Sequence, residues 1–442
     1  MLNLTGQNIA VLGAGRSGLA AAKLASRCGA SVTVYDSCGA DRFSDFPAQI
    51  KTHPGASPAT GAATLSDLVI VSPGIETKGE FVQSFAINTG GLWGEIELAW
   101  RCYSGKTIGI TGTNGKTTTT ELVDVLVRAT GKTCAPCGNY GVPFSEVVLR
   151  DVVPEVVALE LSSFQLETTV DFKPDAIVWL NFSADHMDRY EDLMEYFEAK
   201  QRIFAKADAQ TPVVIRQGET LLSLPGLPGR ITTFSTEEAA DWTLNGDLIQ
   251  QGDSPFVDLS RTRLRGLHNA ENLMAACAVV EDLTPELATA ALAAYQPPAH
   301  RCEWVGTFDQ VEWLNDSKAT NLHALEAALR SQTRPAVLIA GGKQKGLDYQ
   351  PLAPLMKEKV TQAIFFGEIG AALAVTFFDT VPCETVDTLA EAVALAASKA
   401  KPGDSVLFSP GTSSFDQFSG YEARGDAFRS AVLNLHQSPS PT

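Results

Sequence analysis

The sequence lacks the long apolar run that a membrane-spanning helix needs. Its apolar stretches, such as Asp67-Leu-Val-Ile-Val-Ser72, have the length of a strand and fall far short of the roughly 20 residues that cross a bilayer. The start, from Met1 to Gly18, also lacks a basic segment followed by an apolar stretch and a cleavage site. We therefore expect no signal peptide and no membrane association.

Cysteine and basic residues are also scarce. The 442 residues include 8 cysteines, and 34 Lys and Arg face 51 Asp and Glu, which gives a net charge of −17. A chain of this length needs no disulfides, so we expect a reducing cytoplasm. The charge argues against general nucleic-acid binding, although a local loop can still bind a small anion. Length predicts about three domains, and the 45% hydrophobic content is ample for several cores.

Short strands rich in Val and Ile alternate with helical stretches, which predicts an α/β fold. We expect a Rossmann-like domain at residues 1–95, a P-loop ATPase-like domain at 96–299 and a second Rossmann-like domain at 300–442. Residues Thr211–Arg265 are more β-rich, and Gln296–Ala299 is predicted to be a linker. The main predicted strands are Asn8–Leu12, Ser31–Asp36, Leu68–Val71, Lys106–Ile110, Val156–Glu160, Ala176–Leu180, Val311–Leu314, Ala336–Ala340, Ala363–Phe366 and Ser405–Phe408, and two predicted helices are Ser17–Cys28 and Ala324–Arg330.

The strongest motif is Ile110-Thr-Gly-Thr-Asn-Gly-Lys-Thr-Thr118, between an apolar strand and a helix. Backbone N–H groups at such a helix start can hold phosphate oxygens, Lys116 would neutralise the β- and γ-phosphates, and the Thr117 hydroxyl would reach Mg²⁺. Ile110 stands where the usual pattern has its first glycine, and a glycine turn that binds nothing is the alternative. The Lys-Thr pair favours nucleotide binding by Gly112, Thr113, Asn114, Gly115, Lys116, Thr117 and Thr118.

A second glycine turn, Gly13-Ala-Gly-Arg-Ser-Gly18, follows the first strand, and Asp36 ends the next one. This pattern is typical of dinucleotide binding and keeps an NAD(P)-dependent oxidoreductase as the second hypothesis. A helix N-terminus binds pyrophosphate whatever is attached to it, so another pyrophosphate compound is an alternative, as is a bare structural turn. The turn Ser72-Pro-Gly74 would supply further donors, and the phosphate loop of the next domain argues against hydride chemistry.

Three single residues and one cysteine pair are further candidates. Glu160 ends an apolar strand beside the phosphate loop, where a carboxylate can hold Mg²⁺, with a capping or surface glutamate as the alternative. Spacing alone favours a structural role for His186, and it predicts that Lys200, in an amphipathic helix, is a solvated lysine. No second pair completes a metal site with Cys134-Ala-Pro-Cys137, so we expect no metal there.

In combination these residues resemble the Mur ligase family across essentially the whole chain. No Asp-Asn-Pro-Arg signature of the relatives that add a diamino acid is present. The motifs that carry the resemblance are, in chain order, Thr111-Gly-Thr-Asn-Gly-Lys-Thr117, Leu159-Glu-Leu-Ser-Ser-Phe-Gln-Leu-Glu167, His186-Met-Asp-Arg-Tyr190, Gly266-Leu-His-Asn269 with Asn272, His300-Arg301, Asn315-Asp-Ser-Lys-Ala-Thr-Asn321 and Ser413-Ser-Phe-Asp-Gln-Phe418.

The resemblance implies an ATP-dependent, amide-forming ligase of cytoplasmic peptidoglycan precursor synthesis. The alanyl carboxylate of UDP-N-acetylmuramoyl-L-alanine would attack the γ-phosphate of ATP, and the amine of D-glutamate would then displace phosphate from the acyl phosphate. The resemblance also implies two magnesium ions, one held by Thr117 and Glu160 and a second held by His186, and a carbamylated Lys200 that supplies oxygen donors for Mg²⁺. We expect a monomer that binds neither nucleic acid nor membrane.

The resemblance assigns the remaining site residues by position. The chain departs from the family pattern at two positions, because Gln344 stands where an acidic residue is frequent and Tyr421 where phenylalanine is common. A folylpolyglutamate synthase, which would use a pterin-linked glutamate, and a module that only binds nucleotide are the related alternatives. The expected contacts are Asn269, Asn272, Arg301, Asp316 and Lys318 for ATP, Arg16, Ser17, Asp36, Ser37, Ser72, Pro73, Gly74, Asn139 and His186 for the UDP substrate, and Thr320, Lys345, Ser414 and Tyr421 for D-glutamate.

Overall fold

The protein is described by a computed structural model that covers residues 2–185, 189–296 and 299–437. It divides into two compact units, which are described separately below. The first unit contains Met1–Val257 and Glu271–Leu292, and the second contains Asp258–Ala270 and Ala293–Thr442. None of the helices in the described part of the chain has the length and apolar character that a bilayer crossing demands.

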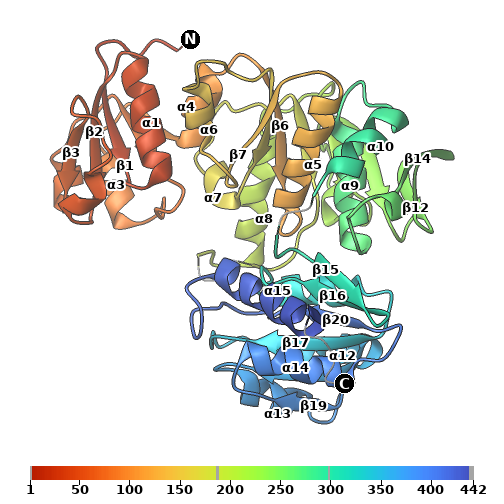
Figure 1. Cartoon of the computed structure of the whole chain (residues 1–442). Helices are drawn as coiled ribbons and strands as arrows, with labels where there is room; N and C mark the ends of the chain where they lie inside the picture. The colour runs from red at the N-terminus through yellow and green to blue at the C-terminus, as the bar shows by residue number, and fades with distance from the viewer. Residues whose placement is uncertain (1, 186–188, 297–298, 438–442) are drawn as a thin grey trace. The chain divides into compact units, whose positions relative to one another are not determined.

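The first unit begins with a five-stranded parallel sheet in the order β3-β2-β1-β4-β5 (Figure 1). Alternate residues of its strands face α1 on one side and α3 on the other, as the two-residue period of a strand requires. The glycine turn after β1 therefore lies where the strand order reverses, a common ligand position. The elements are β1 (Asn8–Leu12), α1 (Arg16–Arg27), β2 (Ser31–Asp36), β3 (Lys51–Pro54), α2 (Pro58–Ala62), β4 (Leu68–Val71), α3 (Glu80–Ala86), β5 (Leu92–Gly94) and α4 (Glu95–Cys102).

A nine-stranded sheet in the order β14-β13-β12-β11-β10-β9-β6-β8-β7 forms the rest of the first unit. Strand β6 lies between β8 and β9, and all three are parallel, so their carboxyl ends meet at one edge. The elements are β6 (Lys106–Thr111), α5 (Lys116–Ala129), β7 (Cys134–Gly138), α6 (Phe144–Val148), β8 (Val156–Glu160), α7 (Ser163–Leu166), β9 (Ala176–Trp179), α8 (Leu193–Gln201), β10 (Pro212–Arg216), β11 (Arg230–Ser235), β12 (Trp242–Asn245), β13 (Leu248–Gln251), β14 (Ser254–Asp258), α9 (Leu267–Val279) and α10 (Pro285–Ala294).

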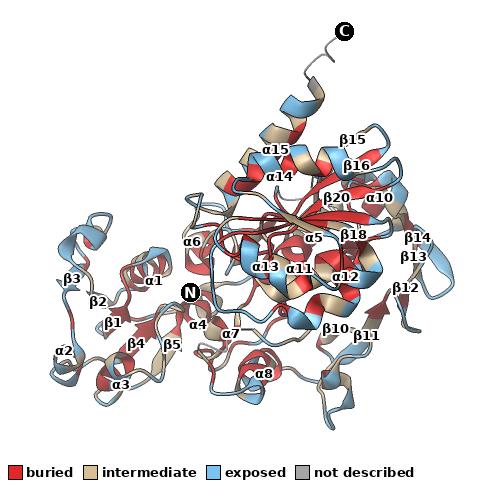
Figure 2. Ribbon diagram, turned by 90° about the horizontal axis from the view of Figure 1, so that it is seen from below, coloured by how far each residue is buried: buried red, intermediate tan, exposed pale blue. Residues whose placement is uncertain are grey.

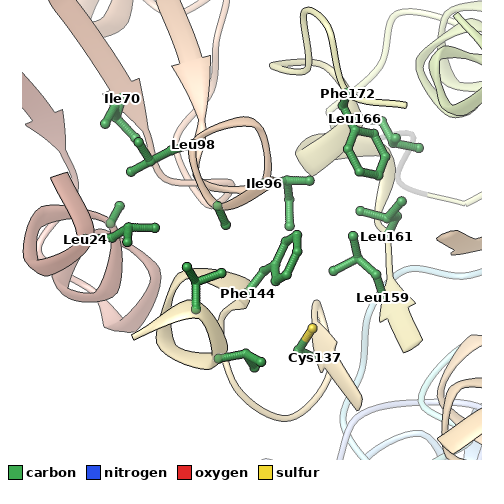
Figure 3. Packing of buried hydrophobic residues seen from close by; sticks show 14 of the residues in the cluster. Leu24, Ile70, Ile96, Leu98, Cys137, Phe144, Leu159, Leu161, Leu166 and Phe172 are labelled. Carbon is green, nitrogen blue, oxygen red and sulfur yellow. The ribbon is translucent and has the colours of Figure 1, made fainter. Parts of the chain in front are cut away.

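The two sheets of the first unit share one hydrophobic core. Helix α4 follows the first sheet directly, and its Ile96 lies beside Phe144 of α6 in Figure 3. Leu24 of α1 belongs to the same buried cluster, as does Leu159 of β8. Since burial of apolar area is the main stabilising contribution to a fold, this continuous core holds the first glycine turn and the phosphate loop in one compact body.

The second unit contains a six-stranded sheet in the order β15-β16-β20-β17-β18-β19, in which only β15 is antiparallel among the pairings described. Along β17, Val337 and Ile339 face α14 and α15, whereas Leu338 and Ala340 face α11 to α13. Figure 2 shows the buried strands in red between helices with exposed outer faces. The elements are β15 (Glu303–Phe308), β16 (Val311–Asn315), α11 (Leu322–Arg330), β17 (Ala336–Gly341), α12 (Ala353–Lys359), β18 (Val360–Phe366), α13 (Gly370–Phe377), β19 (Cys383–Thr385), α14 (Leu389–Lys399), β20 (Ser405–Phe408) and α15 (Tyr421–Gln437).

The predicted α/β fold class is confirmed, and each predicted strand is present with its ends within three residues of the expected ones. The helix predicted at Ala324–Arg330 begins earlier, at Leu322, because the side chain of Asn321 accepts a hydrogen bond from the backbone N–H of Ala324 and so caps it. Cys134 and Cys137, which the sequence left without a secondary structure, lie on strand β7. Part of the predicted linker, residues 297–298, lies outside the described residues.

Candidate functional site

The phosphate loop connects β6 to α5 at the carboxyl edge of the nine-stranded sheet. Gly115 has φ +84 directly before α5, and Gly112 has φ +151, two conformations that favour glycine. A Cβ atom on Gly112 would lie 2.9 Å from the Cβ of Leu180, so the loop also passes close to the end of β9. Thr117 and Thr118 are buried at the start of α5. The sequence thus folds into the strand, loop and helix that phosphate binding requires.

Two lysine side chains meet at one carbonyl group of this loop. The Nζ atoms of Lys116 and Lys200 each donate to the carbonyl oxygen of Gly112, both over 2.9 Å, and Lys116 also donates to Thr113. Only 1% of Lys200 is exposed, and its Nζ lies 4.8 Å from the centre of the Tyr196 ring. Burial, and then the Lys116 ammonium, hold the pKa of Lys200 well below its ordinary value. The sequence-based prediction of a solvated Lys200 is therefore wrong.

Glu160 ends β8 and contributes a buried carboxylate next to β6. Its Oε1 atom accepts a hydrogen bond of 2.8 Å from the side-chain amide of Asn139, whose backbone N–H also donates to the Glu160 carbonyl. Its Oε2 atom is buried and has no hydrogen-bond partner in the described part of the chain. A buried carboxylate oxygen without a donor is costly unless something else binds it. A divalent cation would fit this oxygen, and the magnesium role of Glu160 stays a prediction.

No three His, Cys, Asp or Glu side chains within the described ranges come together as a set that could hold a metal ion. The predicted ligand His186 lies outside those ranges. Mg²⁺ in nucleotide sites keeps several waters and binds substrate phosphates, so one or two protein oxygens are sufficient. The Glu160 carboxylate and the Thr117 hydroxyl are therefore an adequate donor set for Mg²⁺ that arrives with a nucleotide.

Two asparagines support the phosphate loop. Asn181, which the sequence analysis missed, accepts from the backbone N–H of Asn114 over 2.8 Å and donates to its carbonyl oxygen over 3.1 Å. Asn272 of α9 lies against Gly115, because a Cβ on that glycine would overlap the Asn272 Oδ1 atom. Asn269, one turn earlier in α9, donates to the carbonyl of Arg265. The position of Asn181 directly after a strand, beside a glycine loop, was the available signal.

At the first glycine turn, Asp36 fixes the backbone. Its two carboxylate oxygens accept from the N–H groups of Ala14 and Cys38, over 2.7 and 2.9 Å. Partial burial acts to raise the pKa of Asp36, but these hydrogen bonds outweigh burial and lower it. The hydroxyl of Ser72, from the turn after β4, is buried without a hydrogen-bond partner among the residues described. The hydroxyl packs closely against the first glycine turn, because a Cβ atom on Gly13 would lie 2.7 Å from it.

The other residues expected around the UDP substrate are more dispersed. The Arg16 guanidinium donates to the carbonyl of Gly141 over 2.7 Å and lies 3.5 Å from Glu146, so it contacts α6 and the loop before it. The expected residues Ser17 and Pro73 are half-buried, and Ser37, Gly74 and Asn139 are exposed. Asn139 donates to Glu160, at the end of the strand beside the phosphate loop. For Ser17, Ser37, Pro73 and Gly74, no contact with the phosphate loop is described.

In the second unit, Asp316 directly follows β16 and is buried. It accepts from the Ser409 hydroxyl over 2.8 Å and from the backbone N–H of Cys302 over 3.2 Å. Burial raises the pKa of Asp316 to about 7, although both hydrogen bonds and the charge of Arg301 act to lower it. Two residues with positive φ, His300 at +66 and Cys302 at +45, flank Arg301. Arg301 thus lies in a constrained backbone segment, and the charge of its side chain acts on Asp316.

The residues expected to bind D-glutamate form contacts at the carboxyl edge of the six-stranded sheet. The Lys345 ammonium donates to the Thr320 carbonyl over 3.3 Å, and Lys318 donates to the Tyr421 hydroxyl over 3.2 Å. Ser414 is buried on the loop after β20. The Gln344 side chain accepts from the backbone N–H groups of Lys345 and Gly346. A neutral amide therefore shapes this loop at the position where an acidic residue is frequent.

Arg424 is a buried residue that the sequence analysis missed. Its guanidinium donates to the Ser317 hydroxyl and carbonyl, over 3.1 and 2.7 Å, and to the Thr412 carbonyl over 3.1 Å. It is fully buried, and burial lowers its pKa to about 10. Arg424 joins the segment before Lys318 to the segment before Ser414, so it supports both sides of the expected pocket. An arginine in the first turn of a helix carries no local signal of burial.

Two other features lie away from this chemistry. Cys134 and Cys137 are buried, and burial raises the pKa of both thiols, so neither is a ready metal ligand or nucleophile. A hollow of about 740 Å³ lies at the amino ends of β6, β9 and β10, with Gly105, Asp175 and Pro212 in its lining. This is the sheet edge opposite the phosphate loop.

The family comparisons agree with this geometry. Residues 110–280 match the family model described as the Mur ligase middle domain, and residues 300–411 match the one described as Mur ligase, glutamate ligase domain. The UDP-N-acetylmuramoylalanine–D-glutamate ligase of Pelodictyon phaeoclathratiforme is 37% identical over 464 residues, which cover 98% of this chain and 99% of the relative. The enzyme of the same name from Geobacter metallireducens is 36% identical, with 100% of both chains covered.

Solved structures show the same fold at low sequence identity. The MurF ligase of Thermotoga maritima, solved in complex with ADP, has a TM-score of 0.59 at 15% identity and covers 98% of this chain and 96% of its own. The UDP-N-acetylmuramate-alanine ligase of the same organism has a TM-score of 0.57 at 17% identity, with 97% and 100% covered. Both structural matches extend over nearly the whole chain.

Proposed function

The chain belongs to the Mur ligase family, and we propose that it adds D-glutamate to UDP-N-acetylmuramoyl-L-alanine with ATP, in cytoplasmic peptidoglycan precursor synthesis. It is an ATP-dependent ligase that forms an amide bond. Relatives that carry the name of this activity match almost the full chain at 36–37% identity. The proposed domains are residues 1–95 for the UDP substrate, 96–299 for ATP and 300–442 for the amino acid.

One observation supports the proposal most. The side-chain amines of Lys116 and Lys200 meet at the Gly112 carbonyl, in a glycine loop at a helix start. The adjacent strand ends in a buried carboxylate oxygen of Glu160 without a hydrogen-bond partner in the described part of the chain. A lysine cation, a glycine loop at a helix start and one carboxylate are what the terminal phosphate of a magnesium-bound nucleotide needs.

In the first step of the proposed reaction, a carboxylate oxygen of the alanyl group attacks the γ-phosphorus of ATP. The bond between this phosphorus and the β–γ bridging oxygen breaks, and ADP leaves with the electron pair. Lys116 would turn from its loop carbonyls to the γ-phosphate and stabilise the charge that the transferring group carries. A free carboxylate is a poor acyl donor, and the acyl phosphate removes that obstacle.

We propose that the Glu160 carboxylate and the Thr117 hydroxyl would hold one Mg²⁺ and His186 a second, with carbamylated Lys200 as a further oxygen donor. When bound, Mg²⁺ neutralises the phosphate oxygens and orients them for transfer. The buried Glu160 Oε2 atom supports this assignment.

Carbamylation of Lys200 is supported by the burial of its amine. The reaction joins the neutral amine nitrogen to the carbon of CO₂ and releases one proton, which leaves a carbamate with two oxygens. Burial next to Lys116 favours the neutral amine, which is the form that attacks CO₂. The product would supply oxygen donors, which Mg²⁺ prefers, where the unmodified ammonium cannot be a ligand.

In the second step, the amine of D-glutamate attacks the carbonyl carbon of the acyl phosphate. The tetrahedral intermediate loses phosphate, the nitrogen loses a proton, and the amide remains. The carboxylates of D-glutamate would pair with Lys345 and with hydroxyl or backbone groups at Thr320, Ser414 and Tyr421. The Lys345 ammonium and the loop shaped by Gln344 support this assignment.

The test is a phosphate-release assay in which ATP, Mg²⁺, UDP-N-acetylmuramoyl-L-alanine and D-glutamate are omitted one at a time. We expect full release only with all four, and loss of turnover when L-glutamate replaces D-glutamate. Equal turnover with both glutamate enantiomers would remove the proposed acceptor. Turnover with a pterin-linked glutamate and without the UDP compound would favour a folylpolyglutamate synthase.

A further inference from the structure

Two motifs of the chain contain residues to which the proposed reaction gives no role. They are Leu159-Glu-Leu-Ser-Ser-Phe-Gln-Leu-Glu167, whose last residue follows α7, and the residues Arg189 and Tyr190 that precede α8. The structure brings Arg189 and Tyr190 into direct contact with Glu167, together with Thr77 from the loop between β4 and α3. We call Thr77, Phe164, Glu167, Arg189 and Tyr190 the Glu167 network.

Both carboxylate oxygens of Glu167 are engaged in this network. The Oε1 atom accepts from the Tyr190 hydroxyl over 2.7 Å, and the Oε2 atom accepts from the Thr77 hydroxyl over 2.7 Å and from the Arg189 guanidinium over 3.3 Å. The Glu167 and Arg189 side chains are only 16% and 15% exposed. A mostly buried, hydrogen-bonded ion pair is held far more firmly than a pair on the surface, so the geometry is well defined.

Arg189 also contacts the loop that follows β4. The Nη2 atom that pairs with Glu167 also donates to the carbonyl of Ile75 over 3.2 Å. The guanidinium lies over the Phe164 ring, 4.4 Å from its centre, and that ring stacks on Tyr190. A planar guanidinium can stack on a ring and donate in its own plane, whereas the compact ammonium of lysine cannot do both. The site therefore requires an arginine.

The network connects two segments that the proposed reaction uses. Ile75 and Thr77 follow the Ser72–Gly74 turn, which carries the unpartnered Ser72 hydroxyl. Glu167 follows α7, which begins shortly after Glu160 at the end of β8. The distance between the turn expected to hold the pyrophosphate and the strand end expected to hold Mg²⁺ is thus set by side-chain contacts.

We propose that Glu167, Arg189 and Tyr190 are positioning residues that hold the Ser72–Gly74 turn in place, so that the carboxylate of the UDP-linked substrate reaches the γ-phosphate. This inference rests on the proposed function. A substrate held at one end by the first sheet reacts at its other end, so a displaced turn misplaces the reacting oxygen. A misplacement of about 1 Å costs on the order of 10²-fold in rate.

The test compares Arg189→Lys, Glu167→Gln and Tyr190→Phe with a matched control, Lys78→Met. Lys78 joins the same parts of the molecule through its ion pair with Glu195, but its side chain is 70% exposed. Phosphate release is measured against the concentration of each substrate, and the affinity for UDP-N-acetylmuramoyl-L-alanine is measured by calorimetry without ATP. Thermal unfolding of each variant reports on the fold.

We expect Arg189→Lys to raise KM and Kd for the UDP substrate and to lower kcat, by about 10- to 100-fold in kcat/KM, with KM for ATP within about twofold. Tyr190→Phe should act in the same direction but less, and the control should stay within about twofold of the native protein. The Glu167→Gln and Arg189→Lys effects should not be additive, since the residues are in contact.

Unchanged kcat and unchanged Kd for the UDP substrate in Arg189→Lys would overturn the inference. Equal changes in KM for ATP and for the UDP substrate would also overturn it, because they would indicate a general structural role. Absence of phosphate release from the native protein would instead refute the proposed function, and the calorimetric Kd values would still decide about the network.

Discussion

Gly115→Ala is the substitution from which the structure predicts the most specific defect. Gly115 has φ +84, where a side chain costs about 1–2 kcal/mol. The new Cβ would also overlap the Oδ1 atom of Asn272, whose side chain accepts from the Thr119 hydroxyl over 3.4 Å. Asn272 and Thr119 are both buried, so the phosphate loop has to move instead, by on the order of 1 Å. Such a shift costs about 10²-fold in rate.

Gly131 supplies the matched control at the other end of α5. It has φ +87, almost the same conformation, but a Cβ there would meet no atom within 4 Å. Both Gly115→Ala and Gly131→Ala should lower the thermal unfolding midpoint, because the backbone strain is shared, and Gly115→Ala should lower it by at least as much, because it adds the overlap with Asn272. In a phosphate-release assay against ATP concentration, we expect kcat/KM to fall about 100-fold for Gly115→Ala and less than about twofold for Gly131→Ala. Equal kcat/KM in the two variants would refute the reasoning.

Three further substitutions test other parts of the structure. Burial raises the pKa of Glu95 from 4.5 to about 7, so the native state holds a proton that the unfolded chain releases, and stability falls as pH rises through this window. The difference in unfolding free energy between Glu95→Gln and the native protein should thus be more favourable to the variant at pH 8 than at pH 5, by roughly 3 kcal/mol at most. Thermal unfolding that gives the same difference at both pH values would contradict this. Lys200→Ala should abolish phosphate release, and short carboxylic acids should restore part of it; full activity without them would exclude a ligand role. Arg424→Met should lower the calorimetric unfolding midpoint, because the Ser317 and Thr412 carbonyls lose a buried donor, a loss of roughly 2–4 kcal/mol, and an unchanged midpoint would show that other groups replace it.

Local sequence signals were sufficient for ten of the strands, which lie in all three sheets, and for the two glycine turns. The strand Val156–Glu160 was predicted from its apolar run, and the phosphate loop from glycine and Lys-Thr spacing. These features depend on backbone preferences and on burial of consecutive residues, which a short window contains. The same window placed Glu160 at a strand end, which is where its buried oxygen lies.

Residues whose roles depend on distant partners were not predictable in this way. Lys200 occupies the buried face of a helix, and only its partner 88 positions away, Gly112, explains an amine there. Arg424 is buried by contacts with Ser317, 107 positions away, and its sequence neighbours give no sign of this. Long-range polar contacts are decided by topology, and one sequence does not reveal which polar side chains the fold encloses.

The most direct test of the proposed chemistry follows the oxygen atoms of the substrate carboxylate. UDP-N-acetylmuramoyl-L-alanine labelled with ¹⁸O in the alanyl carboxylate is converted with ATP, Mg²⁺ and D-glutamate, and the released phosphate is analysed by mass spectrometry. If the carboxylate attacks the γ-phosphorus, one labelled oxygen leaves with each phosphate and the other remains in the amide. Phosphate that contains no ¹⁸O, formed together with the amide product, would contradict an acyl-phosphate intermediate.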